Sequence, residues 1–146
     1  MARYARTMDA SQTTFAVETR GPGLTEITPR VAAWLPARDG LLTLMIRHTS
    51  ASLLIQENAD PDVQSDLQAW LTRLAPSSDD PAMAYLTHTY EGPDDMPGHI
   101  RAAHLPVSLS IPVAAGRMRL GTWQGIYVWE HRDRPHRREI AAHFAG

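Results

Sequence analysis

The sequence predicts an α+β fold with mainly antiparallel β-sheets and a few helices. Several short segments alternate apolar and polar residues, as half-buried strands do, and one longer segment has helical periodicity and clear end signals. The helical segments interrupt the strands without the regular strand–helix alternation of a parallel sheet, which favours the α+β class. At 146 residues the chain is most simply one domain, residues 1–146, with enough length to bury a sizeable core.

Strands dominate the predicted N-terminal part of the chain. Residues 13–19, "TTFAVET", alternate as a first strand, and "RGPG" follows as a turn. Residues 25–37 resemble a short helix, with Thr28 as a possible N-cap and Pro29 at the first helical position. A long strand then runs from Leu41 to about Glu57, and we expect it to bend or bulge at residues 50–52.

Residues 59–76, "ADPDVQSDLQAWLTRLAP", form the clearest predicted helix. Asp60 is the expected N-cap, Pro61 occupies the first helical position and Pro76 ends the helix. One apolar stripe runs along it, made of Val63, Leu67, Trp70, Leu71 and Leu74.

The second half of the chain begins with an irregular polar stretch, residues 85–97, of the kind that often carries binding residues. One or two helical turns are expected at 98–105. Residues 107–114 alternate as a strand, in which Pro112 favours an edge or end position. Residues 117–132 predict a strand or hairpin, and residues 137–144 a last strand.

The composition excludes several classes of site. There is no cysteine, so disulfides, thiolate nucleophiles and cysteine zinc sites are absent, and all 14 basic residues are arginine, which excludes lysine Schiff-base chemistry. A net charge of -2 argues against a general nucleic-acid binder. No apolar run reaches membrane-spanning length, so no membrane partner is expected. Residues 1–15 lack the apolar region of a signal peptide, and the expected location is the cytoplasm.

Three of the seven histidines are the candidate metal ligands. His48 continues the apolar row of its strand, where an imidazole needs a hydrogen bond or a metal, and a core histidine bonded to the backbone is the alternative. His88 and His99 flank the polar stretch. On a helix His99 and His104 would point about 140° apart, so only one of them can face a given ion, and His99 is the better candidate. A divalent metal, zinc or magnesium, is the expected cofactor.

Acidic and polar residues supply the other candidates. In "GTWQGIYVWEH" the extended chain places Gln124 and Glu130 on one face with two aliphatic residues, and a buried carboxylate there needs a charged partner, a metal or a proton. The alternative is a half-exposed strand with Glu130 in water. Asp95 can act as a base or orient a metal ligand. Residues 131–139, rich in arginine, are interpreted as a solvated turn, with anion capture as the alternative.

Three blocks of sequence, "HTSASLLIQENADPDVQSDL", "YEGPDDMPGHI" and "LGTWQGIYVWEHR", resemble the signature blocks of the YjbQ-like family, in order and spacing. The resemblance covers the chain from about Thr13 onward. It implies an α+β fold that assembles as a homotrimer, with sheets packed around the threefold axis. It also implies a site of histidines and acidic residues near subunit boundaries. Carried over by position, the pattern falls on His48 with Thr49 and Ser50, Asn58, His88, Asp95 with His99, and Gln124 with Glu130.

The resemblance further implies an activity like that of thiamine-phosphate synthase, as a secondary reaction on small phosphorylated substrates. In the resulting assignment His48, His88 and His99 bind the metal. Thr49, Ser50 and Asn58 contact substrate, and Asp95, Glu130 and Gln124 are catalytic. Phosphate groups could be held by Arg47, Arg101 or Arg132. The alternatives are metal-assisted hydrolysis of a small phosphate compound, with Asp95 or Glu130 as base, and a non-enzymatic trimer that binds a ligand or metal.

Overall fold

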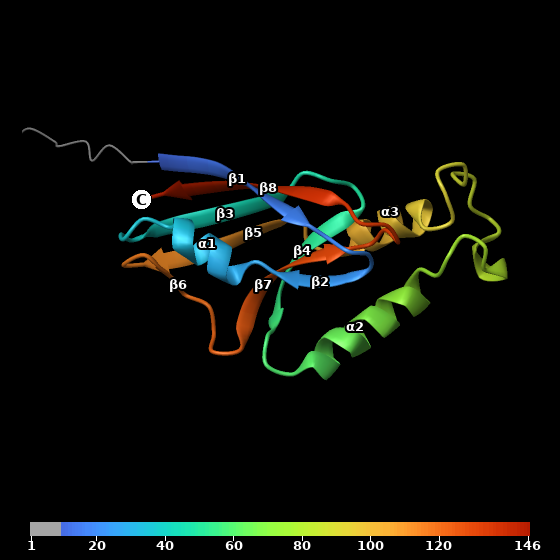
Figure 1. Cartoon of the computed structure of the whole chain (residues 1–146), viewed down its shortest axis with the longest axis horizontal. Helices are drawn as coiled ribbons and strands as arrows, with labels where there is room; N and C mark the ends of the chain where they lie inside the picture. Colours follow the sequence, from blue (N-terminus) through green and yellow to red (C-terminus); the bar gives the residue numbers. More distant parts are fainter. Residues whose placement is uncertain (1–9) are drawn as a thin grey trace, which may run out of the picture.

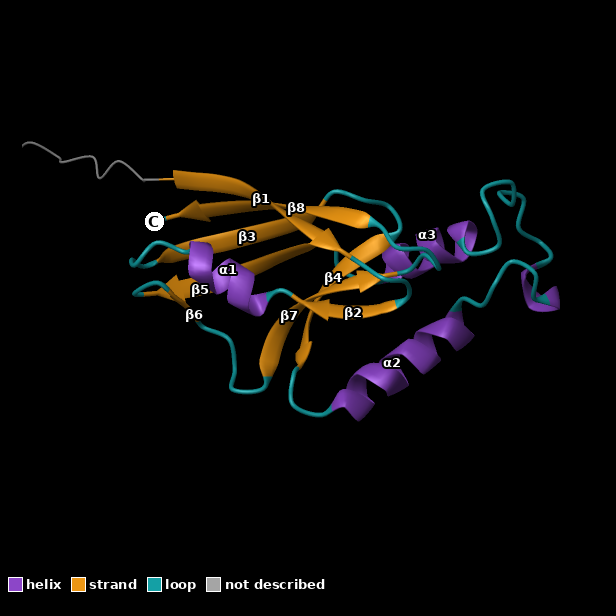
Figure 2. Cartoon of the chain, viewed as in Figure 1, coloured by secondary structure: helices purple, strands orange, loops and turns teal. Residues whose placement is uncertain are grey.

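Two antiparallel β-sheets share one hydrophobic core (Figures 1 and 2). The computed structural model describes residues 10–146. The expectation of no signal peptide rests on residues 1–15, of which 1–9 lie outside the described residues. The larger sheet has the strand order β1-β8-β3-β5-β6 and the smaller sheet β2-β7-β4. The predicted α+β class with mainly antiparallel sheets is confirmed.

The strands divide unequally between the two sheets. The larger sheet contains β1 (Ala10–Glu18), β8 (Arg137–Ala145), β3 (Gly40–Ile46), β5 (Ser108–Ala114) and β6 (Arg117–Met118). The smaller sheet contains β2 (Gly23–Glu26), β7 (Gln124–Glu130) and β4 (Ala51–Glu57). The helices are α1 (Thr28–Trp34), α2 (Pro61–Leu74) and α3 (Asp95–His104), with a 3-10 turn, η1 (Pro81–Met83). Within the described part of the chain, every helix is too short or too polar to cross a membrane.

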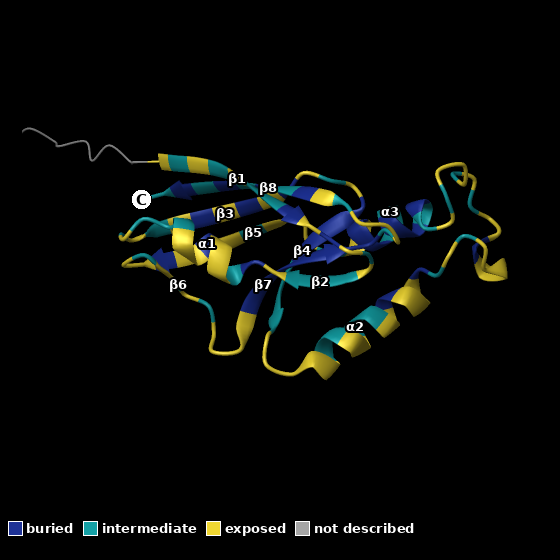
Figure 3. Ribbon diagram, viewed as in Figure 1, coloured by how far each residue is buried: buried dark blue, intermediate teal, exposed yellow. Residues whose placement is uncertain are grey.

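The core lies between the inward faces of the two sheets (Figure 3). In β3 the residues Leu42, Leu44 and Ile46 are buried, and the residues between them are exposed, as the alternating pattern predicts. The facing strand β7 is different, because every residue from Gly125 to Glu130 is buried. The sequence left open which face of β7 is buried, and the structure shows that both faces are covered. Two polar side chains at its end, Glu130 and His131, are therefore enclosed.

The long strand predicted from Leu41 to Glu57 is wrong as one element. The chain leaves the larger sheet after Ile46 and enters the smaller sheet at Ala51, so β3 and β4 belong to different sheets. Residues 47–50 make the crossing, and Arg47 donates its backbone N–H to Glu139 of β8 as the chain departs. In the same way residues 117–132 form neither a single strand nor a hairpin, because β6 and β7 also lie in different sheets. Periodicity locates strands but does not assign them to sheets.

The N-terminal part differs from the prediction in three places. β1 begins at Ala10, before the predicted strand, and the short strand β2 was missed between the turn and α1. Thr28 is not an N-cap, since α1 already includes it. Its hydroxyl instead donates to Glu26 Oε2 at 2.8 Å and accepts the backbone N–H of Ile126 at 2.8 Å. Thr28 therefore ties α1 to β2 and β7, a tertiary role that local pattern does not reveal.

The structure confirms the predicted start of α2, but only part of its predicted apolar stripe is buried. Asp60 caps the helix by accepting the N–H of Asp62 at 2.9 Å, and Pro61 is the first helical residue, as predicted. Of the apolar stripe Leu71 is fully buried, but Trp70 and Leu74 are 57% and 43% exposed. The helix lies along one side of the fold, next to the smaller sheet, so one part of its stripe is left uncovered (Figure 1). α3 begins at Asp95, before the predicted 98–105.

Alanine substitutions at two glycines, one tightly packed and one with room for a side chain, test how closely the chain packs at these positions. A Cβ on Gly40 would lie 2.5 Å from the backbone oxygen of Ala145, whereas a Cβ on Gly98 in α3 would lie 3.5 Å from its nearest neighbour, Ser50 Cβ. We expect Gly40→Ala to lower the free energy of unfolding by about 1–3 kcal/mol. Gly98→Ala should raise it by up to about 1 kcal/mol, because alanine favours a helix interior. Urea denaturation followed by circular dichroism measures both, and equal effects would contradict the packing of these two glycines.

Candidate functional site

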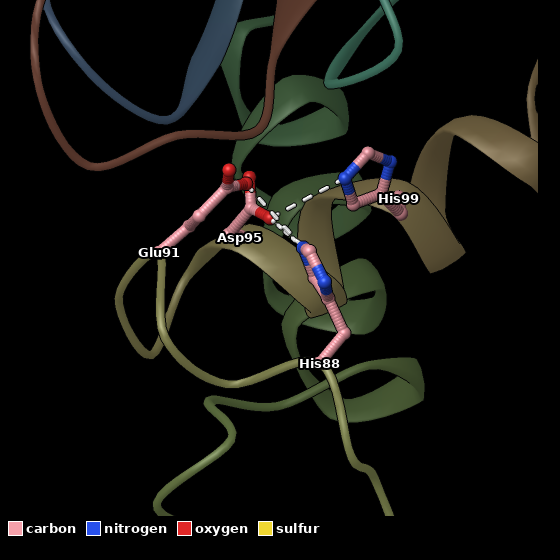
Figure 4. A group of neighbouring side chains, drawn as sticks. All are labelled: His88, Glu91, Asp95 and His99. Atoms are coloured by element: carbon pink, nitrogen blue, oxygen red, sulfur yellow. Dashed lines mark hydrogen bonds and ion pairs between the residues drawn. The ribbon is translucent and has the colours of Figure 1, made fainter.

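Four side chains meet at the start of α3 and form the clearest candidate for a metal centre (Figure 4). Asp95 is the first residue of α3, and His99 follows one helical turn later on the same face. His88 and Glu91 come from the polar loop before the helix. One ligand atom from each of these four residues lies within 4.8 Å of the other three. The polar stretch and the helix start thus bring together two imidazoles and two carboxylates.

The carboxylate of Asp95 is the centre of this group. Its Oδ2 lies 2.8 Å from His88 Nε2 and 3.3 Å from His99 Nε2. Glu91 Oε2 lies 3.3 Å from the same nitrogen of His88. Asp95 is 5% exposed at its side chain, while Glu91 is 54% exposed. The group is therefore anchored in the protein at Asp95 and open to solvent at Glu91.

Arg132 holds the acidic side of the group in place. Its Nη1 donates to Asp95 Oδ1 at 2.7 Å, and its Nε donates to Asp94 Oδ2 at 2.9 Å. Burial alone would raise the pKa of Asp95, but the hydrogen bond with His88 and the charge of Arg132 lower it overall below the ordinary value. The contacts of Arg132 with Asp94 likewise raise the pKa of Arg132. Asp95 is thus an anion with one oxygen fixed by Arg132 and the other facing the histidines.

The donor set fits a divalent metal ion. Ligand atoms around a tetrahedral zinc ion with bonds of about 2.0 Å lie about 3.3 Å apart. Three contacts in the group, at 2.8–3.3 Å, are close to this spacing, and all four ligand atoms lie within 4.8 Å of one another. Two imidazole nitrogens favour zinc or another transition metal over magnesium, which prefers oxygen ligands. Asp95 would also have its second oxygen oriented by Arg132, as the outer partners of metal ligands usually do.

The structure separates His48 from His88 and His99, with which sequence reasoning grouped it. His48 follows β3, and its Nε2 accepts the backbone N–H of Glu139 at 2.8 Å. Burial lowers its pKa, with the charge of Arg138 in the same direction. His48 is therefore a neutral imidazole bonded to the backbone, and its Nε2 is not available to an ion. Within this one chain it is not part of the group at α3.

The predicted substrate contacts Thr49, Ser50 and Asn58 are divided between two regions. Thr49 is exposed beside His48, and Ser50 Oγ accepts a hydrogen bond from Arg138 at 3.0 Å. Asn58 lies after β4, where its backbone N–H donates to Trp123 O.

Gln124 lies with Asn58 and away from the metal candidate. Glu57, the residue before Asn58, pairs with Gln124 at one end of the β4–β7 ladder, and Ala51 pairs with Glu130 at the other. Gln124 and Glu130 are six residues apart on one strand, which is about 20 Å. The side chain of Gln124 accepts the backbone N–H of Gly121 at 2.8 Å. Within one chain the predicted catalytic pair Gln124 and Glu130 cannot share a small site.

Glu130 is enclosed in a network of hydrogen bonds. Its Oε1 accepts from Thr19 Oγ1 at 2.6 Å and from Arg138 Nε at 2.8 Å. Its Oε2 accepts from Arg138 Nη2 and from the backbone N–H groups of His131 and Arg132. Burial alone would raise the pKa of Glu130, but the bonds from Arg138 and Thr19 lower it overall. A fully bonded, buried anion is poorly placed to accept a proton, so the geometry favours a structural role over the predicted catalytic one.

The interpretation of residues 131–139 as a solvated turn is wrong for three of its members. His131 and Arg138 are buried, and Arg132 is bound to Asp94 and Asp95. Arg134 and Arg137 are exposed, as a solvated turn predicts. The run therefore supplies buried partners to carboxylates at two places, and the sequence alone gives no sign of which arginines turn inward.

Glu91 is the member of the group that sequence reasoning missed. The order His88, Glu91, Asp95 and His99 has intervals of three, four and four residues, and the last interval is one helical turn. Extending the helix back to Asp95 would have shown that Asp95 and His99 share a face. His104, the histidine set aside in favour of His99, is exposed and bonded through Nδ1 to the carbonyl of Ile100, outside the group.

His131 gives the protein an expected pH dependence. Burial, together with the charges of Arg101 and Arg138, lowers its pKa to about 3. An unfolded histidine titrates near 6.5, so between these values the unfolded state binds a proton that the folded state does not. The free energy of unfolding should therefore fall as the pH falls from 6.5 towards 3, by up to about 1.4 kcal/mol per pH unit from this group.

The variant His131→Gln tests this dependence because glutamine retains a polar group near Ser52. Urea denaturation at pH 7, 6 and 5 should show a shallower loss of stability in the variant than in the wild type. The carboxylates with lowered pKa values lose their contribution only at more acidic pH. His48, whose pKa is also lowered, is present in both proteins, so the difference between their slopes reports His131. Identical slopes for the two proteins would contradict a buried neutral His131.

Comparisons with known proteins agree with this fold. The family model described as "UPF0047 protein YjbQ-like" matches residues 13–146. A UPF0047 protein of Synechocystis is 44% identical over 149 residues, which covers 100% of this chain and 99% of that protein. The UPF0047 protein YjbQ of Salmonella typhimurium is 45% identical over 121 residues, 83% of this chain and 84% of that protein.

Solved structures give the same result. A conserved hypothetical protein from Thermus thermophilus superposes with a TM-score of 0.78 at 33% identity, covering 89% of this chain and 97% of that one. A YbjQ-like protein from Sulfolobus solfataricus superposes with a TM-score of 0.79 at 20% identity, covering 95% of this chain and 99% of that one. The second match shows the fold alone.

Proposed function

Because the chain belongs to the YjbQ-like UPF0047 family, and because His88, Glu91, Asp95 and His99 meet at one point, we propose that it is a metal-dependent enzyme acting on a small phosphorylated substrate. The observation that carries this proposal is the approach of the four ligand atoms to within 4.8 Å of one another. A bound divalent ion supplies a Lewis acid that neutralises phosphate charge.

A cavity beside the group gives the substrate room. It has a volume of about 450 Å³, and the charged residues and histidine that line it are Glu91, Asp94, Arg132, Asp133, Arg134 and His136. Arg134 is exposed there, and its guanidinium is suited to phosphate oxygens. A phosphate group in this cavity would lie near Arg134 and Glu91, the one candidate metal ligand that lines it. Arg47 and Arg101, the other predicted phosphate contacts, lie outside the lining of this cavity.

The reaction we propose is coupling of the thiamine-phosphate-synthase type. The thiazole nitrogen forms a bond to the methylene carbon of the pyrimidine diphosphate, the carbon–oxygen bond breaks, and pyrophosphate leaves with the electron pair. This reaction needs no general base, since the attacking nitrogen carries a lone pair and no proton. This agrees with the state of the two carboxylates considered as bases, since Asp95 in the site and Glu130 outside it are both held in ion pairs. Hydrolysis, in contrast, must remove a proton from water.

Product analysis tests this proposal directly. Protein loaded with zinc or manganese is incubated with both substrates, and with each alone, and the products are identified by mass spectrometry. We expect coupled product and pyrophosphate only when both substrates are present, with loss of turnover after chelation. His104→Ala, an exposed histidine outside the group, serves as the matched control and should keep full activity. Product from the diphosphate alone would identify a hydrolase. Intact substrates after long incubation would identify a non-enzymatic binding protein.

We also propose that the protein forms a homotrimer in the cytoplasm. Large apolar side chains are exposed on several elements, namely Leu41, Met45, Trp70, Leu74, Tyr85, Tyr90, Val107 and Trp123. Two of them, Met45 and Val107, line one cavity together with Ala141, and a contiguous exposed apolar patch is typical of surfaces that pack against another protein. Native mass spectrometry should give three times the mass of one chain, and a monomer would contradict the proposal.

A further inference from the structure

A second cavity lies between α2 and α3, next to the one beside the metal candidate, and Asp94 and Asp133 line both. It has a volume of about 240 Å³, room for about eight water molecules or one small metabolite. Its walls come from α2 through Gln68 and Thr72, from α3 through Arg101, and from the end of β7 through His131. Polar side chains therefore face one another across it from three elements.

Arg101 is a buried cation without a carboxylate partner. It is 7% exposed, and its Nε and Nη2 donate to the carbonyl of Ala75 at 3.2 and 2.7 Å. Among residues 10–146, no carboxylate lies within ion-pair distance of its guanidinium. Nη1 makes no hydrogen bond to these residues. Burial lowers the pKa of Arg101 overall, as expected for a charge removed from water, although the charges of Asp133 and Asp94 act in the opposite direction. The unused end of its planar fork matches the two oxygens of a carboxylate or phosphate.

His131 lines the same cavity and has a ring nitrogen without a partner in residues 10–146. The residue is 1% exposed, and its Nε2 lies 2.8 Å from Ser52 Oγ. Its Nδ1 is buried and has no hydrogen-bond partner among the described residues. When Ser52 donates its hydroxyl hydrogen to Nε2, the ring hydrogen lies on Nδ1 and has no acceptor within the described part of the chain. A buried polar atom left unbonded costs about 1–3 kcal/mol, which a bound oxygen would remove.

The acidic residues at this cavity limit the negative charge of a ligand that can bind there. Asp94 is neutralised by Arg132 and also accepts the backbone N–H of Asp133 at 2.9 Å. Asp133 is exposed at the rim, where solvent screens its charge. The cavity therefore has one unpaired buried cation, Arg101, and one exposed anion. This balance favours a single oxyanion group over a polyphosphate.

We propose that this cavity binds the carboxylate or phosphate group of a small molecule, held by Arg101 and His131. The proposal is independent of the metal candidate, since none of His88, Glu91, Asp95 and His99 lines this cavity. The ligand is a small oxyanion, and the two sources of that chemistry, phosphate and carboxylate, are separated by the experiment.

The test uses full-length protein freed of metal by chelation and dialysed against chloride buffer. Inorganic phosphate and acetate are titrated separately at constant ionic strength, with heat of binding and melting temperature as readouts. We expect saturable binding of at least one of the two and a rise in the melting temperature. Absence of saturable binding by both ions would mean that the cavity holds water and would overturn the proposal.

Variants of Thr72 locate the binding. Thr72 is exposed on α2 and lines the cavity, so substitutions there should leave the protein folded. Thr72→Glu introduces a carboxylate opposite Arg101, and should raise the melting temperature without ligand and abolish the response to it. Thr72→Val, of similar size and without charge, should retain the response. A ligand response in Thr72→Glu equal to that of the wild type would place the binding elsewhere and overturn the proposal.

Discussion

Replacing Glu130 with glutamine should lower the free energy of unfolding by about 3–5 kcal/mol, the range observed when one partner of a buried ion pair is removed. Glu130 and Arg138 are 1% and 4% exposed at their side chains, so the variant leaves the Arg138 charge buried without its anion. Glutamine has nearly the same shape as glutamate, which confines the change to charge and hydrogen bonding. Guanidinium denaturation followed by circular dichroism measures the loss.

A neighbouring ion pair provides the matched control. Arg137 and Glu18 lie 3.4 Å apart and are 67% and 71% exposed. Glu18→Gln should therefore cost less than about 1 kcal/mol. The double variant Glu130→Leu with Arg138→Met should be less destabilised than Glu130→Gln, because it buries no unpaired charge. Equal losses in Glu130→Gln and Glu18→Gln would contradict the structural role and restore Glu130 as a catalytic candidate.

Replacing Asp95 with asparagine should weaken metal binding by more than about 100-fold, since even partners outside the direct ligands change affinity 10–100-fold. Asp95 is the one residue of the group that contacts both histidines, and the substitution removes its charge. Competition with a chromophoric chelator at pH 7 measures the affinity for zinc and manganese.

The variant Asp94→Asn tests whether weaker metal binding in Asp95→Asn comes from lost ligation or from a general loss of negative charge. Asp94 is bound to Arg132 but does not belong to the group of four. Asp94→Asn should change the affinity much less than Asp95→Asn. An equal loss in both variants would mean that net charge near α3, rather than ligation by Asp95, determines metal binding.

Much of the fold could be predicted from the sequence because its signals are local. Asp60 and Pro61 define the start of α2, and the alternation in β3 identifies its buried face. The assignment of β3 and β4 to different sheets could not be predicted, because pairing depends on contacts between residues distant in the chain. The role of Thr28 was missed for the same reason, since its partner Ile126 lies 98 residues away.

The candidate site was predictable to a similar degree. Asp95 and His99 lie one helical turn apart, and His88 lies in the same polar stretch, so their proximity follows from short-range structure. His48 and Glu130 were selected as polar residues within apolar rows, a pattern that also describes buried polar groups satisfied by other parts of the protein. Glu139 supplies the partner of His48, and Arg138 the partner of Glu130. Both partners come from β8, and local patterning of β3 and β7 contains no information about them.

The most direct test of the metal centre is the metal content of untagged, freshly purified protein and of four histidine variants, measured by elemental mass spectrometry. The wild type should contain about one divalent ion per chain, and His88→Ala and His99→Ala should lose it while staying folded. His48→Ala and His104→Ala should retain it, because those imidazoles are bonded to the backbone outside the group. A wild type that stays metal-free after incubation with zinc, manganese and magnesium would contradict the account.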